Sequence, residues 1–156
     1  MTDDLAKIEQ LAGALLRRVG SGERRKILRL MARTLQRSQS ARIARQQDPD
    51  GQPYAARKAQ PTGRLRRKGT IKRKAMFRKL RNASNLQAGS TDIEAWVGFS
   101  GRAAQIARVH QEGLEDAPSK GRTPVRYAKR ILLGDTEAER QALLDILFRN
   151  VAADAR

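Results

Sequence analysis

The sequence predicts an α+β domain with helices at both ends and a small β-sheet between them. Two segments, residues 3–19 and 23–45, carry apolar side chains at spacings of three and four, the period of an amphipathic helix. Residues 91–99 instead alternate apolar and polar side chains, which indicates a strand with one buried face. A third helical pattern closes the chain after Gly134. Helices that flank a sheet in this order are typical of the α+β class.

The length and composition indicate one domain over residues 1–156, with a core of its own. The chain contains no cysteine, which excludes disulfide frameworks, thiolate metal sites and cysteine nucleophiles. No apolar run approaches the roughly 20 residues of a membrane span, so we expect no membrane association. These features predict a protein that is made in the cytoplasm.

The first two predicted helices are separated by Gly20, Ser21 and Gly22, which end one helix and begin the next. One face of the second helix should be buried, and it carries Ile27, Leu28, Met31, Thr34 and Leu35. The opposite face is a basic stripe, made of Lys26, Arg29, Arg33 and Arg37. By itself such a stripe is typical of a solvated helix face.

The middle of the chain begins with a turn and continues as a basic segment. Residues 48–53 hold two prolines, one glycine and two aspartates, which is turn chemistry. Residues 55–74 are rich in Arg and Lys and poor in apolar side chains, so we expect a mobile basic insertion. Residues 75–86, which contain Met76, Phe77 and Leu80, suggest a short helix.

The alternating pattern at residues 91–99 predicts which side chains face the core. Ile93, Val97 and Phe99 should point inward, and Trp96 should lie on the opposite face. An aromatic side chain exposed on a monomer favours a subunit contact, since such residues anchor interfaces.

The last third of the chain predicts one more extended segment between two helices. Residues 102–112 suggest a short helix, and residues 125–133 a second strand or extended segment. Thr136 and Glu139 have the spacing of a capping box at the start of the final helix. The buried stripe of that helix should consist of Leu143, Leu144, Leu147 and Val151.

The net charge of +17 is concentrated in one region of the chain. Between Arg24 and Arg81 lie 20 of the 33 Lys and Arg residues, and Asp48 and Asp50 are the only acidic residues there. Charge packed this tightly repels itself in a monomer, so we expect an acidic partner outside the monomer. Nucleic acid and an acidic protein surface are both candidates. A membrane-surface helix would need a broad apolar face, which residues 55–74 lack.

We find no pattern typical of a catalytic site. His110 is the only histidine, the carboxylates are scattered, and no Gly-rich phosphate loop occurs. We therefore expect no enzymatic activity, no metal and no cofactor. His110 should have a structural role, in which the imidazole caps or bridges backbone groups of a nearby turn. The same reasoning argues against a nuclease or a lysis enzyme.

Three stretches of the chain carry motifs that occur together in one protein family. Residues 42–54 (RIARQQDPDGQPY) are similar to the F-x-x-x-x-D-P-x-G-x-x-W stretch of phage virion morphogenesis proteins. Residues 106–113 resemble the I-A-x-x-H-Q-x-G motif of that family, and residues 126–134 resemble its R-Y-x-x-R-x-L-L-G motif. Order and spacing agree over roughly residues 1–150. Tyr54 stands where the family usually has Trp, and Lys129 where Pro is common.

The resemblance implies a tail completion protein of a temperate tailed phage, of the Mu-like kind or a relative. Such a protein acts at the head-proximal end of the tail, the neck, so that a finished tail can join a DNA-filled head. It implies a location in the virion and a homo-oligomer, expected as a hexameric ring. The implied partners are neighbouring tail and head-connector proteins, with a backbone contact to genomic DNA as a further option. The leading alternative is a sequence-nonspecific nucleic-acid-binding protein of a phage or its host.

Two sets of residues are the predicted contact sites. The basic side chains that should face DNA or an acidic partner are Arg57, Lys58, Arg64, Arg66, Arg67, Lys68, Lys72, Arg73 and Lys74. Trp96 and Tyr127 are predicted at an assembly interface.

Overall fold

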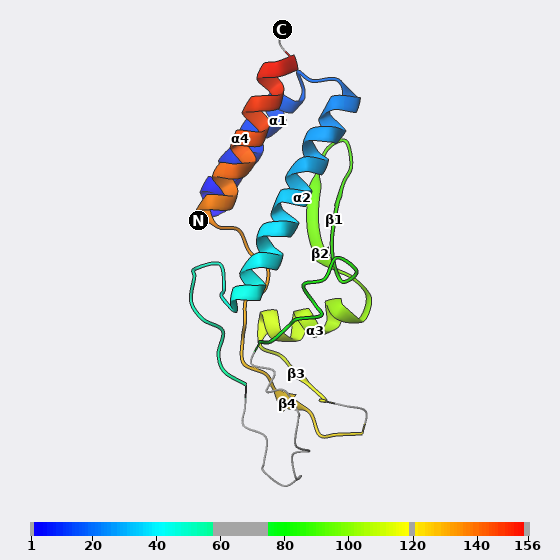
Figure 1. Cartoon of the computed structure of the whole chain (residues 1–156), viewed down its shortest axis with the longest axis vertical. Helices are drawn as coiled ribbons and strands as arrows, with labels where there is room; N and C mark the ends of the chain where they lie inside the picture. Colours follow the sequence, from blue (N-terminus) through cyan, green and yellow to red (C-terminus); the bar gives the residue numbers. More distant parts are fainter. Residues whose placement is uncertain (1, 58–74, 119–120, 155–156) are drawn as a thin grey trace.

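The computed structural model describes residues 2–57, 75–118 and 121–154. Within these ranges the chain forms four helices and two small antiparallel sheets, so the α+β prediction is confirmed (Figure 1). None of the described helices is long and apolar enough to cross a membrane. The elements in chain order are α1 (Thr2–Leu16), α2 (Ser21–Arg45), β1 (Leu86–Ser90), β2 (Ala95–Phe99), α3 (Gly101–Glu112), β3 (Glu115–Asp116), β4 (Val125–Arg126) and α4 (Glu137–Asp154).

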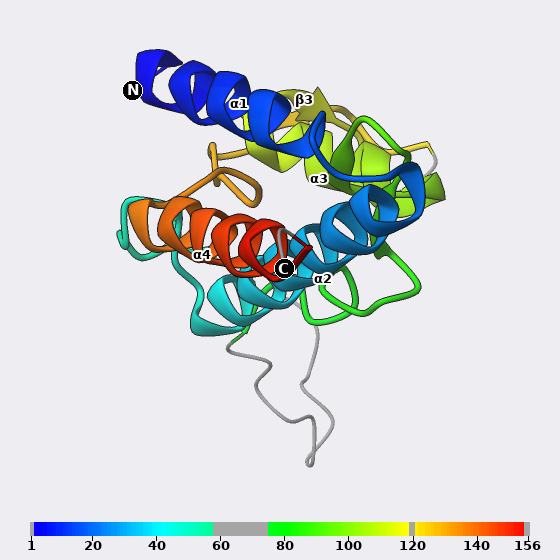
Figure 2. The same cartoon turned by 90° about the horizontal axis from the view of Figure 1, so that it is seen from above.

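Helix α2 is the central element of the fold. It packs against α4 on one side and against the β1–β2 hairpin on the other, while α1 lies against α4 (Figures 1 and 2). The helix begins after Gly20 and ends at Gln46, whose left-handed backbone (φ 62°) turns the chain away. Its predicted apolar face is buried at Ile27, Leu28 and Met31. Its predicted basic stripe is exposed.

The upper half of the molecule contains a helical core between α1, α2 and α4. Its buried members are Leu16, Val19, Ile27, Leu28, Met31 and Leu147. Leu147 is fully buried in α4, and Leu143 and Val151 from the predicted stripe pack against the same cluster. The neighbouring Phe148 points away from this core and is 49% exposed. The helical period of the sequence therefore identified the buried face of α4.

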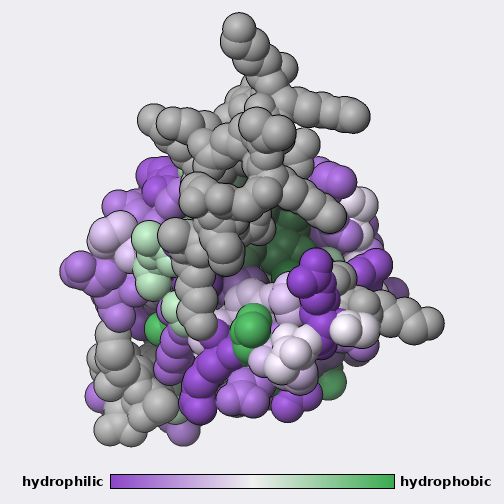
Figure 3. All heavy atoms as spheres, turned by 90° about the horizontal axis from the view of Figure 1, so that it is seen from below, coloured by the Kyte–Doolittle hydropathy of each residue, from purple (hydrophilic) through white to green (hydrophobic). Residues whose placement is uncertain are grey.

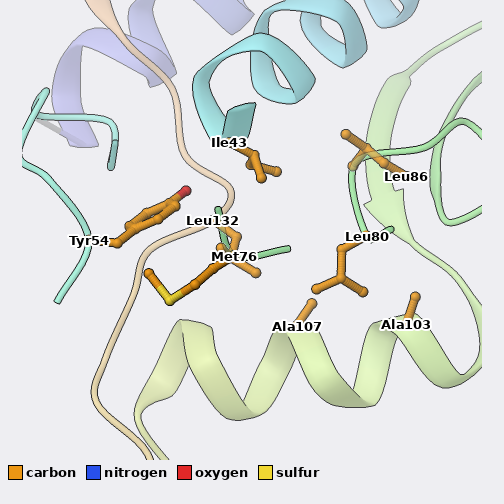
Figure 4. Close-up of a cluster of buried hydrophobic side chains, with 8 residues drawn as sticks. All are labelled: Ile43, Tyr54, Met76, Leu80, Leu86, Ala103, Ala107 and Leu132. Carbon is orange, nitrogen blue, oxygen red and sulfur yellow. The ribbon is translucent and has the colours of Figure 1, made fainter. Parts of the chain in front are cut away.

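A second core, the junction core, lies below the last turn of α2, above α3. Its side chains come from six separate parts of the chain and point toward one another (Figure 4). They are Ile43, Tyr54, Met76, Leu80, Leu86, Ala103, Ala107 and Leu132. Val97 and Phe99 pack against this core from β2, which confirms their predicted direction.

Residues 75–85 do not form the predicted short helix. They make consecutive turns that lead into β1, a strand that we did not predict. Phe77 has a left-handed backbone (φ 62°), which interrupts any right-handed helix at this position. Its ring contacts Tyr54 and His110 edge to face. Contacts with residues remote in sequence therefore outweigh the local helical preference.

The prediction that Ile93 faces the core is wrong. Strand β2 begins only at Ala95, and residues 91–94 form the turn of the β1–β2 hairpin. The Thr91 hydroxyl accepts hydrogen bonds from the backbone N–H groups of Ile93 (3.2 Å) and Glu94 (3.1 Å). This turn leaves Ile93 78% exposed. The apolar alternation of the sequence simply continues through the turn, where it has no structural meaning.

The extended segment predicted at residues 125–133 is a strand only in part. Val125 and Arg126 pair with Asp116 and Glu115, and the chain then continues without strand partners until α4. Side chains from other elements hold this irregular stretch, as the next section shows.

Truncation of Leu147 tests the helical core. Leu147→Ala should lower the free energy of unfolding by about 2 to 5 kcal/mol, because it removes a fully buried side chain and leaves a cavity. Phe148→Ala, at the adjacent position on the exposed face of the same helix, is the matched control. It should lower the free energy of unfolding much less. Denaturant unfolding measures both. Equal losses of unfolding free energy in the two variants would contradict the assignment of the buried face of α4.

Candidate partner-binding site

The three sequence motifs, which are far apart in the chain, meet in one place below α2. Beside the first motif, Arg42 donates to the Gly134 carbonyl of the third motif at 2.9 Å. From the second motif, the Gln111 side chain bonds the backbone of Leu132 and Leu133. The motifs therefore form a single junction that fixes the lower half of the molecule.

Arg42 is the centre of this junction. Its side chain is only 4% exposed and donates from both terminal nitrogens. One nitrogen bonds both carboxylate oxygens of Glu139 at 3.2 Å. The other bonds the side-chain oxygen of Gln39 and the Gly134 carbonyl. A buried guanidinium is tolerated only when it is paired and hydrogen-bonded in this way.

Glu139 connects the same cluster to the start of α4. Its carboxylate accepts a hydrogen bond from the Thr136 N–H at 2.9 Å, and its own N–H donates to the Thr136 hydroxyl at 3.1 Å. This is the predicted capping box. The Glu139 side chain is 5% exposed, so the cap of α4 and the ion pair with Arg42 depend on one buried carboxylate.

Gln111 replaces a strand partner for the irregular segment before α4. Its side-chain oxygen accepts from the N–H groups of Leu132 (2.7 Å) and Leu133 (3.0 Å), and its amide nitrogen donates to the Leu133 carbonyl at 2.9 Å. The next turn requires glycine, because a Cβ on Gly134 would lie 2.6 Å from Pro49 Cγ. One amide side chain thus satisfies three backbone groups that a sheet would otherwise satisfy.

Arg130 anchors the chain just before the basic insertion. It is 6% exposed and donates to the carbonyls of Ala55 at 2.8 Å and Ala56 at 2.9 Å. Its third contact is with His110 Nδ1 at 3.2 Å. His110 therefore bonds a side chain, whereas we expected it to bond backbone groups. The hydrogen bonds from Arg130 to the Ala55 and Ala56 carbonyls therefore hold the backbone that leads to Arg57.

Four rings form a continuous edge-to-face series beside Arg130. Tyr54 contacts Phe77, Phe77 contacts His110, and His110 contacts Tyr127, with centroid distances of 5.7, 4.8 and 5.0 Å. Burial, together with the positive charges of Arg130 and Arg57, lowers the pKa of His110 to about 4. The imidazole is neutral at physiological pH, and its Nδ1 can accept the Arg130 hydrogen bond.

Three of these rings, Phe77, His110 and Tyr127, and the turns of residues 75–82 line a hollow of about 1010 Å³ on the lower face, which we call the junction pocket. Its floor is apolar and includes Met76, Phe77 and Leu80, and its wall includes Ile106 and Val125, which are 40% and 39% exposed. Figure 3 shows an apolar surface on this lower face with hydrophilic residues beside it. A pocket of this composition can bury an apolar side chain of a partner.

The edge of the junction pocket is positively charged. Four exposed residues, Arg57, Arg78, Lys79 and Arg81, form what we call the basic rim. Among the residues that the structure describes, no carboxylate lies within ion-pair distance of any of them. Nor do His, Asp and Glu side chains gather in groups of three that could hold a metal ion within those ranges. The chemistry of this site is therefore suited to docking an acidic, partly apolar ligand.

The predicted contact residues are only partly within the described chain. Arg57 lies on the basic rim, whereas Lys58, Arg64, Arg66, Arg67, Lys68, Lys72, Arg73 and Lys74 fall outside the described residues. Tyr127 is partly buried and lines the junction pocket. Trp96 lies on the outer face of β2, 45% exposed, and covers Gly89 so closely that a Cβ there would clash with the indole. The interface roles of Trp96 and Tyr127 remain predictions.

Sequence reasoning did not single out the residues that organise this site. The motif-bearing stretches contain Arg42, Gln111 and Arg130, but nothing in the sequence indicated that these side chains are buried. The rim residues Lys79 and Arg81 contributed only to the count of basic residues. The signal was present in the motifs themselves. A polar residue that recurs at a fixed place within an apolar stretch is a candidate for a buried, fully bonded position.

Comparison with known proteins decides the family. Residues 3–152 match the model of the phage virion morphogenesis family. The chain belongs to that family. It is 31% identical over 150 residues to the tail completion protein S of Escherichia phage P2, a similarity that covers 96% of this chain and 98% of the relative. No solved structure matches the chain. The resemblance that the three motifs indicated is thereby confirmed.

The buried ion pair between Arg42 and Glu139 allows a test of the junction. Glu139→Gln should lower the free energy of unfolding by about 3 to 5 kcal/mol, because it leaves the Arg42 charge buried without a counter-charge. Glu112→Gln is the control, since its ion pair with Arg108 is exposed and should contribute no more than about 1 kcal/mol. Thermal or denaturant unfolding compares the two. A junction variant as stable as the control would refute the role given to Arg42.

The low pKa of His110 predicts a pH dependence of stability. The folded imidazole has a pKa of about 4 and the unfolded one about 6.5, so the unfolded state binds more protons between these values. The free energy of unfolding should therefore rise as the pH rises through this window, and the contribution of His110 should be complete above pH 6.5. In His110→Gln this part of the dependence should be absent. An NMR titration that gave His110 a pKa of 6.5 or higher would contradict the assignment.

Proposed function

We propose that this chain is a structural assembly protein that completes the head-proximal end of a phage tail, so that the finished tail can join a filled head. Its place would be the virion, at the neck, and its partners would be neighbouring tail and head-connector proteins. We further propose a ring-shaped homo-oligomer, expected to be hexameric. The proposal requires binding only, and no catalytic step is assigned to the chain.

The observation that carries the proposal is the basic-rimmed junction pocket. The buried cations Arg42 and Arg130 donate hydrogen bonds within the fold, although the buried Arg42 Nε has no partner there, whereas the rim cations are exposed and have no carboxylate partners among the described residues. Contact with an acidic surface of another molecule would reduce the mutual repulsion of these exposed cations. The similarity to the P2 tail completion protein over nearly the whole chain supports tail assembly as the setting.

A second candidate is sequence-nonspecific contact with the DNA backbone. The exposed stripe on α2 favours it, because Lys26, Arg29, Arg33 and Arg37 follow one face of a continuous helix. Such a row can contact phosphates without reading bases, and its binding would weaken steeply with salt. In a neck protein this contact would be with the genome as it leaves the head, so the two candidates are compatible.

Deletion of the gene in a phage or prophage that encodes this chain tests the proposed function. Electron microscopy of the lysate should show DNA-filled heads beside unattached tails. The natural gene supplied in trans should restore joined particles. Normal infectious particles from the deletion, or an absence of tails altogether, would refute a role in the completion of the tail.

Charge reversal in the basic insertion should impair joining without unfolding the chain. In Arg66→Glu/Arg67→Glu/Lys68→Glu, plaque yield from the complemented deletion should fall by at least tenfold, since attraction to an acidic surface becomes repulsion. A matched variant, Arg102→Glu/Arg108→Glu/Arg149→Glu, makes the same change of charge at exposed positions outside the basic region. It should retain much more function. Equal yields from both variants would show that the insertion has no specific part in attachment.

A further inference from the structure

The hairpin tip, residues 91–94, is an unusual surface feature. It presents Ile93, which at 78% is the most exposed large hydrophobic side chain of the described residues, between the carboxylates of Asp92 and Glu94. Neither carboxylate has a cationic partner within the described chain. An exposed apolar side chain between two acids is complementary in polarity and charge to an apolar site with a basic rim.

The tip has a defined shape before it meets any partner. The Thr91 N–H donates to the Glu94 carbonyl at 2.9 Å, and the Thr91 hydroxyl accepts from the Ile93 and Glu94 N–H groups. The strands behind it pair over five residues, from Ser90 with Ala95 to Leu86 with Phe99. A preorganised tip loses little conformational freedom on binding, which favours affinity.

The junction pocket has the complementary properties. Its lining includes apolar side chains, its edge is the basic rim, and its volume of about 1010 Å³ is at the upper end of the range for pockets that bury a drug-sized ligand, which leaves room for an isoleucine side chain. Charges of opposite sign would meet around the inserted side chain: Asp92 and Glu94 from the tip, Lys79 and Arg81 from the rim. Such complementarity fixes register and speeds association.

Tip and pocket cannot meet within one molecule. The tip lies beside the first half of α2, and the pocket lies beyond its last turn, next to α3 and β4 (Figure 1). A contact between them must therefore join two molecules. It would use different surfaces on the two copies, which is the heterologous kind of interface that closes into a ring or continues as a filament.

We propose that the hairpin tip of one copy of this chain docks in the junction pocket of a second copy, with Ile93 as the apolar anchor and its two flanking acids on the basic rim. The inference rests on the homo-oligomer of the proposed function but not on its place in the tail, because the contact can be measured on the purified chain. The chain's own basic insertion is a poor occupant for the same pocket, since residues 58–74 contain no acidic residue to meet the rim.

Sedimentation of the purified full-length chain at several concentrations tests this contact. The natural chain should associate with itself, and Ile93→Ser should weaken the association by about 10- to 100-fold, as expected for an isoleucine that is buried on binding. Leu30→Ser is the matched control, because Leu30 is also exposed (45%) but lies on α2. It should associate as the natural chain does. Circular dichroism of each variant establishes that it is folded.

Mixing two deficient variants tests the direction of the contact. A tip variant, Ile93→Ser/Glu94→Gln, keeps its pocket, and a rim variant, Lys79→Glu/Arg81→Glu, keeps its tip; the two altered surfaces do not attract each other. Each alone should be monomeric, and the mixture should give a one-to-one complex that grows no further, because only one intact contact is available. A natural chain that stays monomeric, a tip variant that associates like the control, or a mixture that forms no complex would each overturn the proposal.

Discussion

The burial of one guanidinium group determines how the lower half of this protein is arranged. Arg42 projects from the last turns of α2 into the interior, where a buried cation needs a counter-charge and acceptors from the protein. Both terminal nitrogens find them, whereas the buried Nε has no hydrogen-bond partner. Glu139 supplies the counter-charge from α4, and the Gly134 carbonyl supplies a further acceptor from the segment before it. Satisfying one side chain thus brings together elements that are more than ninety residues apart in sequence.

The other polar contacts of the junction extend this arrangement outward. Gln111 holds the backbone that leads to α4, and Arg130 holds the two residues that precede Arg57. The aromatic series then continues from Tyr54 through Phe77 and His110 to Tyr127, and the last three rings line the junction pocket. In this frame the terminal nitrogens of Arg42 and Arg130 are bonded inside the fold, whereas the cations of the basic rim are exposed. This division between bonded and exposed charge is what the proposed role in assembly requires.

Much of the fold could be predicted from local patterns, and the errors have specific causes. The helical period located α1, α2 and α4, and the capping-box spacing located the start of α4. The helix predicted at residues 75–86 failed because the left-handed backbone of Phe77 fits its ring among remote aromatic residues, which no local pattern reveals. Ile93 was assigned to the core because apolar alternation cannot distinguish a strand from the turn that precedes it. The motifs marked Gln111 and Arg130 as part of a family signature, whereas Arg42 only adjoins the first motif, and the partners of all three became visible only in three dimensions.

Native-state hydrogen exchange of the backbone amides tests the central claim, that the junction is a fixed part of the fold. The Leu132 and Leu133 amides lie in a segment without strand partners and are bonded only by the Gln111 side chain. If the junction is fixed by Arg42 and its partners, these two amides should exchange only by global unfolding, with the same free energy as the Met31 amide in α2. Rapid exchange of Leu132 and Leu133 while Met31 stays protected would show that the segment opens locally, and it would contradict the account.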